Sequence, residues 1–407
     1  MFIFTVALIV HFPVLNCGFT NWDDPITILE NPLVKTLSWN NLTTLFTTST
    51  LNMFGPLSFL SYAVEHWLFG FDPFFFHATN LVLHALNAVL VFLFISSLMN
   101  SRPVGMITAL LFVAHPIQVG TVAWLTERRN VLCGVFFWAS LFAYVQFSEC
   151  RKTRCYCLSF GCLLLALLCK GSAFTLPLLF LACDLFRRQL PDRISLRDKL
   201  PFFLLALLFV GITLMAAQTG VRGESSLIRY ATGCYAYFFY LAKLLIPMNF
   251  SCFYPIPQFP PGELPWLLIL ATGGFVAQFA VMFLSWGRNQ TFLFGSLFFF
   301  VNIVPTLQFL PVGLELLGND HNTYFAAVGL FVMVAGAWEW AYVRWAGKKL
   351  GQIVLGGLLI ALLIALSGVT RERCEVWRNS VTLFEDAVSQ TPLAVFRLKH
   401  LGLAYLD

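Results

Sequence analysis

The sequence predicts an all-helical protein that crosses a membrane many times. Of its 407 residues, 58% are hydrophobic and only 11% are charged, and the mean hydropathy is +0.78, whereas about a quarter of the residues of a soluble domain are charged. Apolar runs recur along the chain, and a helix needs roughly 20 apolar residues to satisfy its backbone polar groups across a bilayer. We therefore expect about eleven transmembrane helices and a structured first external loop.

The first predicted span begins at the N-terminus. Residues Met1 to Leu15 are apolar, but they lack the basic start and the small-residue cleavage site of a signal peptide. Ten further spans are predicted at residues 78–99, 104–117, 130–147, 157–169, 172–186, 200–218, 264–286, 290–306, 323–343 and 350–369.

Basic residues set the predicted orientation, because Lys and Arg favour the cytoplasmic side of a membrane. They cluster between the apolar runs, at Arg102; at Arg151, Lys152 and Arg154; at Arg187, Arg188, Arg193, Arg197 and Lys199; at Arg288; and at Arg344, Lys348 and Lys349. This distribution places the N-terminus inside and the C-terminus outside. It also explains the net charge of +5 as a topology signal, so no nucleic-acid partner is predicted.

Residues 229–247 are apolar enough to span, but a crossing there would move Arg288 and the Arg344 cluster to the outside. The tyrosines and Lys243 of this segment suit the membrane surface. We therefore expect an interfacial helix on the outer surface.

Eleven cysteines are scattered along the chain. Only Cys150, Cys155 and Cys157 lie close together, and a zinc site would need a fourth ligand. We therefore predict packing or solvated thiols and no metal site. No cofactor is firmly predicted, although a divalent cation stays open.

The first external loop, residues 16–77, has the character of a folded segment. It contains many aromatic residues and five prominent acids, Asp23, Asp24, Glu30, Glu65 and Asp72. Ser38 and Gly55-Pro56 have the character of helix starts. This loop is where chemistry is most readily expected.

Several motifs resemble the membrane domain of TPR-containing O-mannosyltransferase-like proteins. They are Gly18 to Pro32, Leu68 to Pro73, His77 to His84, Val113 to Pro116, Val122 to Leu132, Lys170 at the opening of a span, Tyr240-Leu-Ala-Lys-Leu-Leu and Phe253-Tyr-Pro255. The match follows nearly the whole chain in order. This family in turn resembles the GT-C glycosyltransferases, which move a sugar from a polyprenyl phosphate to an acceptor on the non-cytoplasmic side.

The resemblance implies a GT-C-like membrane enzyme that takes a hexose, with mannose as the suggested sugar, from a polyprenyl-phosphate donor to Ser or Thr of a protein acceptor. The enzyme would be an integral, multi-pass protein of a bacterial inner membrane or the endoplasmic reticulum membrane, surrounded by lipid and active on the periplasmic or luminal side. Two other functions stay open: a noncatalytic membrane anchor that presents TPR helices, and a lipid-linked sugar transporter.

The resemblance also divides the chain into two regions. Residues 1–369 form the GT-C-like transmembrane domain, and residues 370–407 are expected to start an external TPR-like helical region. Helices are predicted at residues 380–392 and 398–405. A stable repeat stack needs about three repeats, so we expect either a truncated array or a minimal cap.

Asp24 and Asp23 are the candidate catalytic residues. Directly after the first span, one of them could act as a general base toward an acceptor hydroxyl, and two adjacent carboxylates raise one of the two pKa values. The alternative is an Asx turn before Pro25.

Arg128, Arg129 and Lys170 are the candidate donor-phosphate residues. An arginine pair at the outer mouth of a span can grip a phosphate, although interfacial anchoring of the arginines and snorkelling of the lysine are the alternatives. Six further residues are pocket candidates: Glu127, His77, His115, Lys243, Asp320 and His321. His77 and His84 share a helix face with Asn80, and structural hydrogen bonding is the expected role of both histidines.

Three positions depart from the family pattern that the resemblance implies. Gly120 stands where a glutamate is common, Gly55 lies near a common polar or basic residue, and His321 replaces an arginine. The changes at Gly120 and His321 remove a possible acid and a possible phosphate ligand, so activity could be altered or lost.

Overall fold

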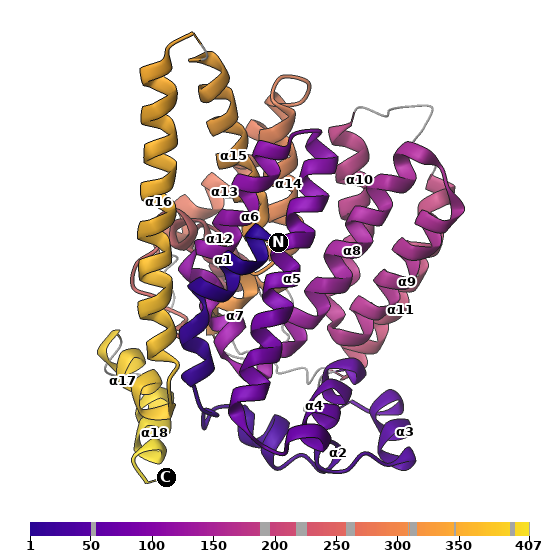
Figure 1. Cartoon of the computed structure of the whole chain (residues 1–407), viewed down its shortest axis with the longest axis vertical. Helices are drawn as coiled ribbons and strands as arrows, with labels where there is room; N and C mark the ends of the chain where they lie inside the picture. The colour runs from indigo at the N-terminus through magenta and orange to yellow at the C-terminus, as the bar shows by residue number, and fades with distance from the viewer. Residues whose placement is uncertain are drawn as a thin grey trace.

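The computed structural model describes residues 1–49, 54–187, 196–216, 226–257, 265–307, 309, 316–345, 347–390 and 395–406. Helices dominate this part of the chain (Figure 1). Its β-structure is a short antiparallel pair, β1 (Tyr254–Pro255) with β2 (Leu316–Gly318). The predicted all-α fold class is therefore confirmed. Arg188 and Arg193 of the predicted basic clusters lie outside the described residues.

Each of the eleven predicted spans corresponds to a helix. The first is α1 (Phe2–Val10), which continues into the short helix η1 (Phe12–Asn16). The others are α5 (Pro73–Met99), α6 (Arg102–Ala114), α8 (Arg128–Cys150), α9 (Thr153–Cys169), α10 (Leu176–Phe186), α11 (Leu196–Ala216), α13 (Trp266–Leu284), α14 (Gln290–Ile303), α15 (Ala327–Arg344) and α16 (Lys349–Val376).

By length and composition, five helices of the described chain can cross a membrane, namely α5, α8, α11, α13 and α16. A sixth crossing arises if α6 and the bent segment Pro116–Ala123 form one broken span, with an angle of 58° between the two parts. Shorter apolar helices lie at residues 153–169, 171–186 and 290–306. The count of eleven crossings stays a prediction.

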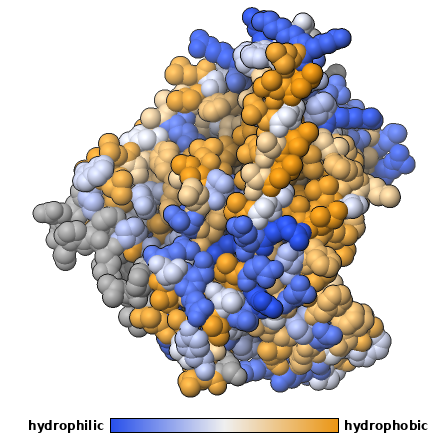
Figure 2. Space-filling model, turned by 60° about the vertical axis from the view of Figure 1, so that its left-hand side comes forward, coloured by the Kyte–Doolittle hydropathy of each residue, from blue (hydrophilic) through white to orange (hydrophobic). Residues whose placement is uncertain are grey.

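The outer surface of the helices is apolar, as a lipid environment requires. On α16, the exposed side chains include Leu350, Ile353, Leu358, Ile360 and Ile364. Figure 2 shows hydrophobic residues along the upper part of this face, with hydrophilic groups above and below them. A face of this kind has no favourable partner in water, so it indicates contact with lipid tails.

The first external loop is folded as predicted. It contains α2 (Pro32–Lys35), α3 (Trp39–Thr47) and α4 (Pro56–Phe69). The Ser38 side chain accepts a hydrogen bond from the Asn41 backbone and caps α3. Tyr62 of α4 donates its hydroxyl to the Leu125 carbonyl at 2.7 Å, which ties the loop to the start of α8.

The C-terminal helices α17 (Ser380–Gln390) and α18 (Val395–Ala404) follow α16 and pack on each other. They lie at the same end of the molecule as α2–α4, opposite the turn between α15 and α16 (Figure 1). Helices therefore lie at the positions predicted at 380–392 and 398–405, although residues 391 and 392 of the first prediction lie outside the described residues.

The segment predicted to be interfacial forms α12 (Ser226–Leu245). It packs mainly on α13. In its middle a Cβ on Gly233 would lie 2.8 Å from the Leu307 carbonyl oxygen, and nearer its end the Tyr240 hydroxyl accepts a hydrogen bond from the Asn319 N–H at 3.1 Å. Its position relative to the membrane stays a prediction.

Candidate functional site

A cavity of about 190 Å³ lies between α4, the start of α8, the end of α9 and α11. Its walls combine aromatic side chains with Ser and Thr hydroxyls and two cations. The lining residues are Thr27, Phe54, Gly55, Ser58, Phe59, Tyr62, Thr126, Arg129, Cys169, Lys170, Gly171, Ser172 and Thr213. An apolar pocket with a few convergent polar groups is the usual form of a small-ligand site.

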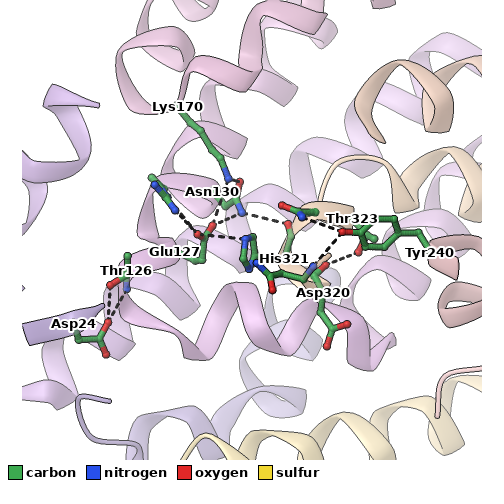
Figure 3. Close-up of polar contacts among 12 residues, drawn as sticks. Asp24, Thr126, Glu127, Asn130, Lys170, Tyr240, Asp320, His321 and Thr323 are labelled. Atoms are coloured by element: carbon green, nitrogen blue, oxygen red, sulfur yellow. Dashed lines mark hydrogen bonds and ion pairs between the residues drawn. The ribbon is translucent and has the colours of Figure 1, made fainter. Parts of the chain in front are cut away.

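Glu127 holds the two cations of this cavity (Figure 3). Its carboxylate accepts hydrogen bonds from Arg129 Nη2 at 2.9 Å and from Lys170 Nζ at 3.5 Å. Lys170 also donates to Asn130 Oδ1 at 2.8 Å. Glu127 is fully buried, whereas the side chains of Arg129 and Lys170 are each 21% exposed. The carboxylate therefore anchors both cations from behind and leaves part of each one accessible.

The charge balance of this cluster is positive. Arg129 and Lys170 carry two positive charges against the single negative charge of Glu127. His321 Nε2 lies 3.7 Å from the same carboxylate, but burial lowers the pKa of His321 to about 4, so its ring is neutral at pH 7. The ionised Asp23 carboxylate interacts with Arg129 and offsets the one positive charge that is left over. The feature that suits an anionic ligand is therefore the pair of partly accessible cations and not a net charge.

Asp24 is buried beside the cavity and accepts four hydrogen bonds. The backbone N–H and the hydroxyl of Thr20 both donate at 2.9 Å. The N–H and hydroxyl of Thr126 donate at 3.1 Å and 2.7 Å, and Thr126 itself lines the cavity. Burial raises the pKa of Asp24, and these four donors oppose that rise. Both carboxylate oxygens are occupied, so Asp24 is suited to hold the loop in place.

Asp23, the neighbouring carboxylate, is half-buried. Burial raises the pKa of Asp23 to about 6, the nearby Arg129 guanidinium lowers it, and Asp24 and Glu127 raise it. A carboxylate with this pKa is largely ionised at pH 7 and still basic enough to accept a proton. Asp23 does not line the cavity, and its electrostatic interaction with Arg129 is what links this carboxylate to the cavity wall.

Arg128, a predicted donor-phosphate residue, does not line the cavity. Its guanidinium is fully buried and forms a salt bridge of 2.5 Å with Glu65. It also donates to Asn80 Oδ1 at 2.8 Å and to the Phe76 carbonyl at 2.7 Å. These contacts tie α8 to α4 and α5, so the role of Arg128 is structural.

Four other predicted pocket residues also lie away from the cavity. His77 faces the Gly18 carbonyl at 3.4 Å, and His115 bonds the Leu244 carbonyl at 3.0 Å. Lys243 donates to the Met248 carbonyl at 3.0 Å, and Asp320 accepts from the Tyr254 hydroxyl at 2.8 Å. His77, His115 and Asp320 join segments that are distant in the sequence, and Lys243 bonds the turn after α12. Among the described residues, no group of three His, Cys, Asp or Glu side chains could hold a metal ion.

Of the three positions that depart from the family pattern, only Gly55 lines the cavity. Gly55 lines the cavity, and a Cβ there would lie 2.7 Å from the Cys169 carbonyl oxygen, so a larger residue would force the backbones apart. Gly120 lies against Trp377 and Asp320 and outside the cavity wall. His321 does not line the cavity, and its Nε2 approaches Glu127 Oε1, the oxygen that Arg129 also contacts.

Sequence reasoning missed several residues of the site. Asn130 lies one helical turn after Glu127, and this i, i+3 spacing of two polar residues on an apolar helix was an available signal. Thr126 precedes the charged triplet, but its bond to Asp24 depends on the fold. Phe54 and Thr213 come from distant elements, and no local pattern indicates them.

The helices and the site define an integral, multi-pass, all-helical membrane protein with a charged cavity. No protein-family model matches the chain. Curated relatives confirm the resemblance to TPR-containing O-mannosyltransferase-like proteins. Protein O-mannosyl-transferase TMTC1 of Homo sapiens is 29% identical over 210 residues, which cover 49% of this chain and 20% of the relative. TMTC1 of Drosophila melanogaster is 30% identical over 189 residues, 44% of this chain and 22% of the relative.

The longest of these matches is to protein O-mannosyl-transferase TMTC3 of Homo sapiens, which is 24% identical over 427 aligned residues, 92% of this chain and 46% of the relative. The chain thus spans less than half the length of these relatives. The crystal structure of ArnT from Cupriavidus metallidurans bound to undecaprenyl phosphate aligns over 96% of this chain and 77% of its own, with 13% identity and a TM-score of 0.44. A likeness at that level carries no argument here.

Proposed function

We propose that this chain is a membrane glycosyltransferase that moves a hexose from a polyprenyl-phosphate donor to a Ser or Thr hydroxyl of a protein. The observation that carries the proposal is the cavity with Arg129 and Lys170 in its wall and the Asp23-Asp24 pair beside it. Mannose is the proposed hexose because the similar proteins are named O-mannosyl-transferases. The proposed site faces the periplasm or the lumen, the side assigned to the first loop by the basic residues.

The donor phosphate would bind at Arg129 and Lys170. Their exposed portions face the cavity, and the aromatic wall of Phe54, Phe59 and Tyr62 would shield the pair from water. In such surroundings a charge-assisted hydrogen bond is stronger than in bulk water. The same two cations would stabilise the polyprenyl phosphate as its negative charge grows on departure.

The reaction would be an inverting displacement at the anomeric carbon. Asp23 accepts the proton of the acceptor hydroxyl, and the hydroxyl oxygen forms a new bond to the anomeric carbon while the bond to the phosphate oxygen breaks. Asp24 would hold the loop through Thr20 and Thr126, and Arg129 would link the base to the phosphate site. Glu127 acts through the two cations that it anchors.

The two other functions are less well supported by these contacts. An anchor would not need a cavity that exposes two cations beside two adjacent carboxylates. A transporter would need an opening through both faces. A second cavity of about 370 Å³ lies beside Glu339 and Trp340, but it shares no lining residue with the first.

A transfer assay tests the proposal. The purified full chain in detergent would be given a polyprenyl-phosphate mannose with a radiolabelled sugar and a Ser/Thr-containing acceptor protein. We expect label on the acceptor that is released by β-elimination, as an O-linked sugar is. Donor binding without any transfer, across polyprenyl-phosphate mannose and glucose, would contradict the enzyme proposal and favour the anchor or the transporter.

A further inference from the structure

A second hydrophobic core lies at the external end, apart from the main core of the helix bundle. Its members come from η1 and the loop after it, from α7 (Val119–Ala123) and the residue after it, from residues 252–253, from the end of α16 and from α17. They include Trp22, Trp124, Phe253, Trp377 and Phe384. This core joins the C-terminal hairpin to the loop that carries Asp23 and Asp24.

The start of α17 and the residues before it bind the backbone of that loop directly. The Asn21 N–H donates to the Ser380 hydroxyl at 2.9 Å, and the Gly18 N–H donates to the Arg378 carbonyl at 2.9 Å. The Asn21 side chain also donates to the His400 carbonyl of α18 at 3.3 Å. These bonds hold the loop immediately before the two carboxylates.

Trp22, the residue before Asp23, is packed between the two halves of this core. Its ring stacks on Trp124 with a centroid distance of 4.4 Å and meets Phe384 of α17 edge-on at 6.3 Å. Trp124 is two residues before Thr126, which holds Asp24. A shift of α17 would therefore reach Asp23 through Trp22 and Asp24 through Trp124.

The second helix of the hairpin supports Trp22 through Phe253. Arg397 of α18 donates to the Phe253 carbonyl at 2.6 Å, and its guanidinium lies 4.7 Å from the centre of the Phe253 ring. That ring meets Trp22 at 5.7 Å. Two independent routes therefore run from the hairpin to the residue beside Asp23.

We infer that the α17–α18 hairpin is a structural part of the reaction site, and that Ser380 and Phe384 are positioning residues for Asp23. This inference rests on the proposed function for its activity readout, although the contacts that carry it do not. The hairpin would align the base with the acceptor hydroxyl, and a small displacement of a base from its proton strongly reduces the rate of transfer.

Two matched serine substitutions on α17 test the inference in the full chain. Ser380→Ala removes the acceptor of the Asn21 N–H, whereas Ser389→Ala removes an exposed hydroxyl that donates only to the Asp386 carbonyl of its own helix. Amide hydrogen exchange of residues 17–24 should become about fivefold faster in Ser380→Ala, as expected for the loss of one hydrogen bond. Ser389→Ala should exchange at the parental rate. Ser380→Thr, which keeps a hydroxyl acceptor, should also exchange at the parental rate.

The activity readout separates positioning from stability. In Ser380→Ala, kcat for sugar transfer should fall about tenfold while KM for the lipid donor stays unchanged, because the cavity does not contact Ser380. The kcat of Phe384→Leu should fall by less than that of Phe384→Ala, because leucine keeps more apolar volume in the core.

Equal hydrogen exchange of residues 17–24 in Ser380→Ala and Ser389→Ala would overturn the inference. So would faster exchange with an unchanged kcat, because the hairpin would then hold the loop without aligning the base. If the parent transfers no sugar while the exchange difference is present, the proposed function fails and the structural coupling between hairpin and loop stands.

Discussion

Asp24 and Thr126 are 102 residues apart in the sequence, yet Asp24 Oδ1 accepts hydrogen bonds from both the backbone N–H and the hydroxyl of Thr126, at 3.1 Å and 2.7 Å. This pair joins the first external loop to the charged start of α8. It brings the carboxylate pair next to the cavity wall that carries Arg129 and Lys170.

Thr126→Val tests the strength of that connection. The substitution keeps the branched shape and removes the hydroxyl donor, so we expect the protein to lose about 1 kcal/mol of unfolding free energy. Thermal unfolding in detergent measures the loss. Thr47→Val, at an exposed hydroxyl of α3, is the matched control and should change stability by less than about 0.5 kcal/mol. Equal stability of the two variants would show that the bond to Asp24 contributes nothing.

Asp23 predicts a specific pH dependence of the reaction. Because burial raises the pKa of Asp23 to about 6, the base is protonated and inactive below that pH. We expect kcat/KM for transfer to rise between pH 5 and 7 with a midpoint near 6 and then to level off. Asp23→Asn should abolish the midpoint as well as most of the activity. A profile of unchanged shape in the residual activity of Asp23→Asn would assign the titration to another group.

The stability of the fold should fall as the pH rises, whereas the activity should increase. The unfolded carboxylate of Asp23 has a pKa of about 3.8, below the folded value of about 6, so the folded state binds more protons between these values. Unfolding free energy should therefore fall as the pH rises through this window. In Asp23→Asn this contribution to the slope should disappear. A slope that does not change between the parent and Asp23→Asn would contradict the raised pKa.

Arg129→Lys should weaken donor binding, whereas Arg128→Lys should lower the stability of the fold. At Arg129, loss of the guanidinium fork should weaken binding of the lipid donor about tenfold with little change in stability. At Arg128, the substitution disturbs a fully buried ion pair with Glu65 and should destabilise the fold by about 3 kcal/mol. Thermal unfolding and donor binding, measured on the folded fraction, distinguish the two.

Removing both charges of the Arg128–Glu65 pair separates a loss of stability from a loss of donor binding. The double variant Arg128→Met with Glu65→Gln removes both buried charges and should recover part of the stability that Arg128→Met alone loses. Its donor affinity should equal that of the parent. A large loss of donor affinity in this stable double variant would return Arg128 to the phosphate site.

The predicted position of α12 can be tested with a membrane-impermeant thiol reagent. In a background lacking the eleven cysteines, a cysteine at Lys348 should react only from the cytoplasmic side if α12 lies on the outer surface. A cysteine at Trp39, which is 81% exposed on α3, is the control for the outer side. Labelling of Lys348→Cys from outside would mean that α12 crosses the membrane and that the count of eleven spans is wrong.

The helices could be predicted from the sequence because a bilayer imposes a simple rule on composition and length. Each predicted span has a helix, and the helix starts at Ser38 and Pro56 were also correct. The residues of α12 were hard to place for the same reason, because an apolar amphipathic helix satisfies the rule whether it crosses or lies flat.

The site was harder to predict than the fold. The predicted residues Arg129 and Lys170 line one cavity with Glu127 bonded to both, whereas Arg128 lies away from it. Their roles in binding the donor stay predictions. Adjacent residues on a helix point about 100° apart, so one arginine faces the cavity and the other faces Glu65, and sequence alone cannot tell which. The preference for Asp23 over Asp24 as the base depends on burial and on the hydrogen bonds from Thr20 and Thr126, which only the folded chain reveals.

The proposed function requires that this chain catalyse sugar transfer with a carboxylate base in its first external loop. The most direct measurement compares sugar transfer by the parent, Asp23→Asn and Asp24→Asn, with donor binding measured separately for each. We predict that Asp23→Asn reduces transfer by about a hundred- to ten-thousandfold with donor affinity unchanged, and that Asp24→Asn reduces transfer together with stability, since four donors then face an amide. Parental rates in both variants would show that the loop is not the catalytic centre and would contradict the claim.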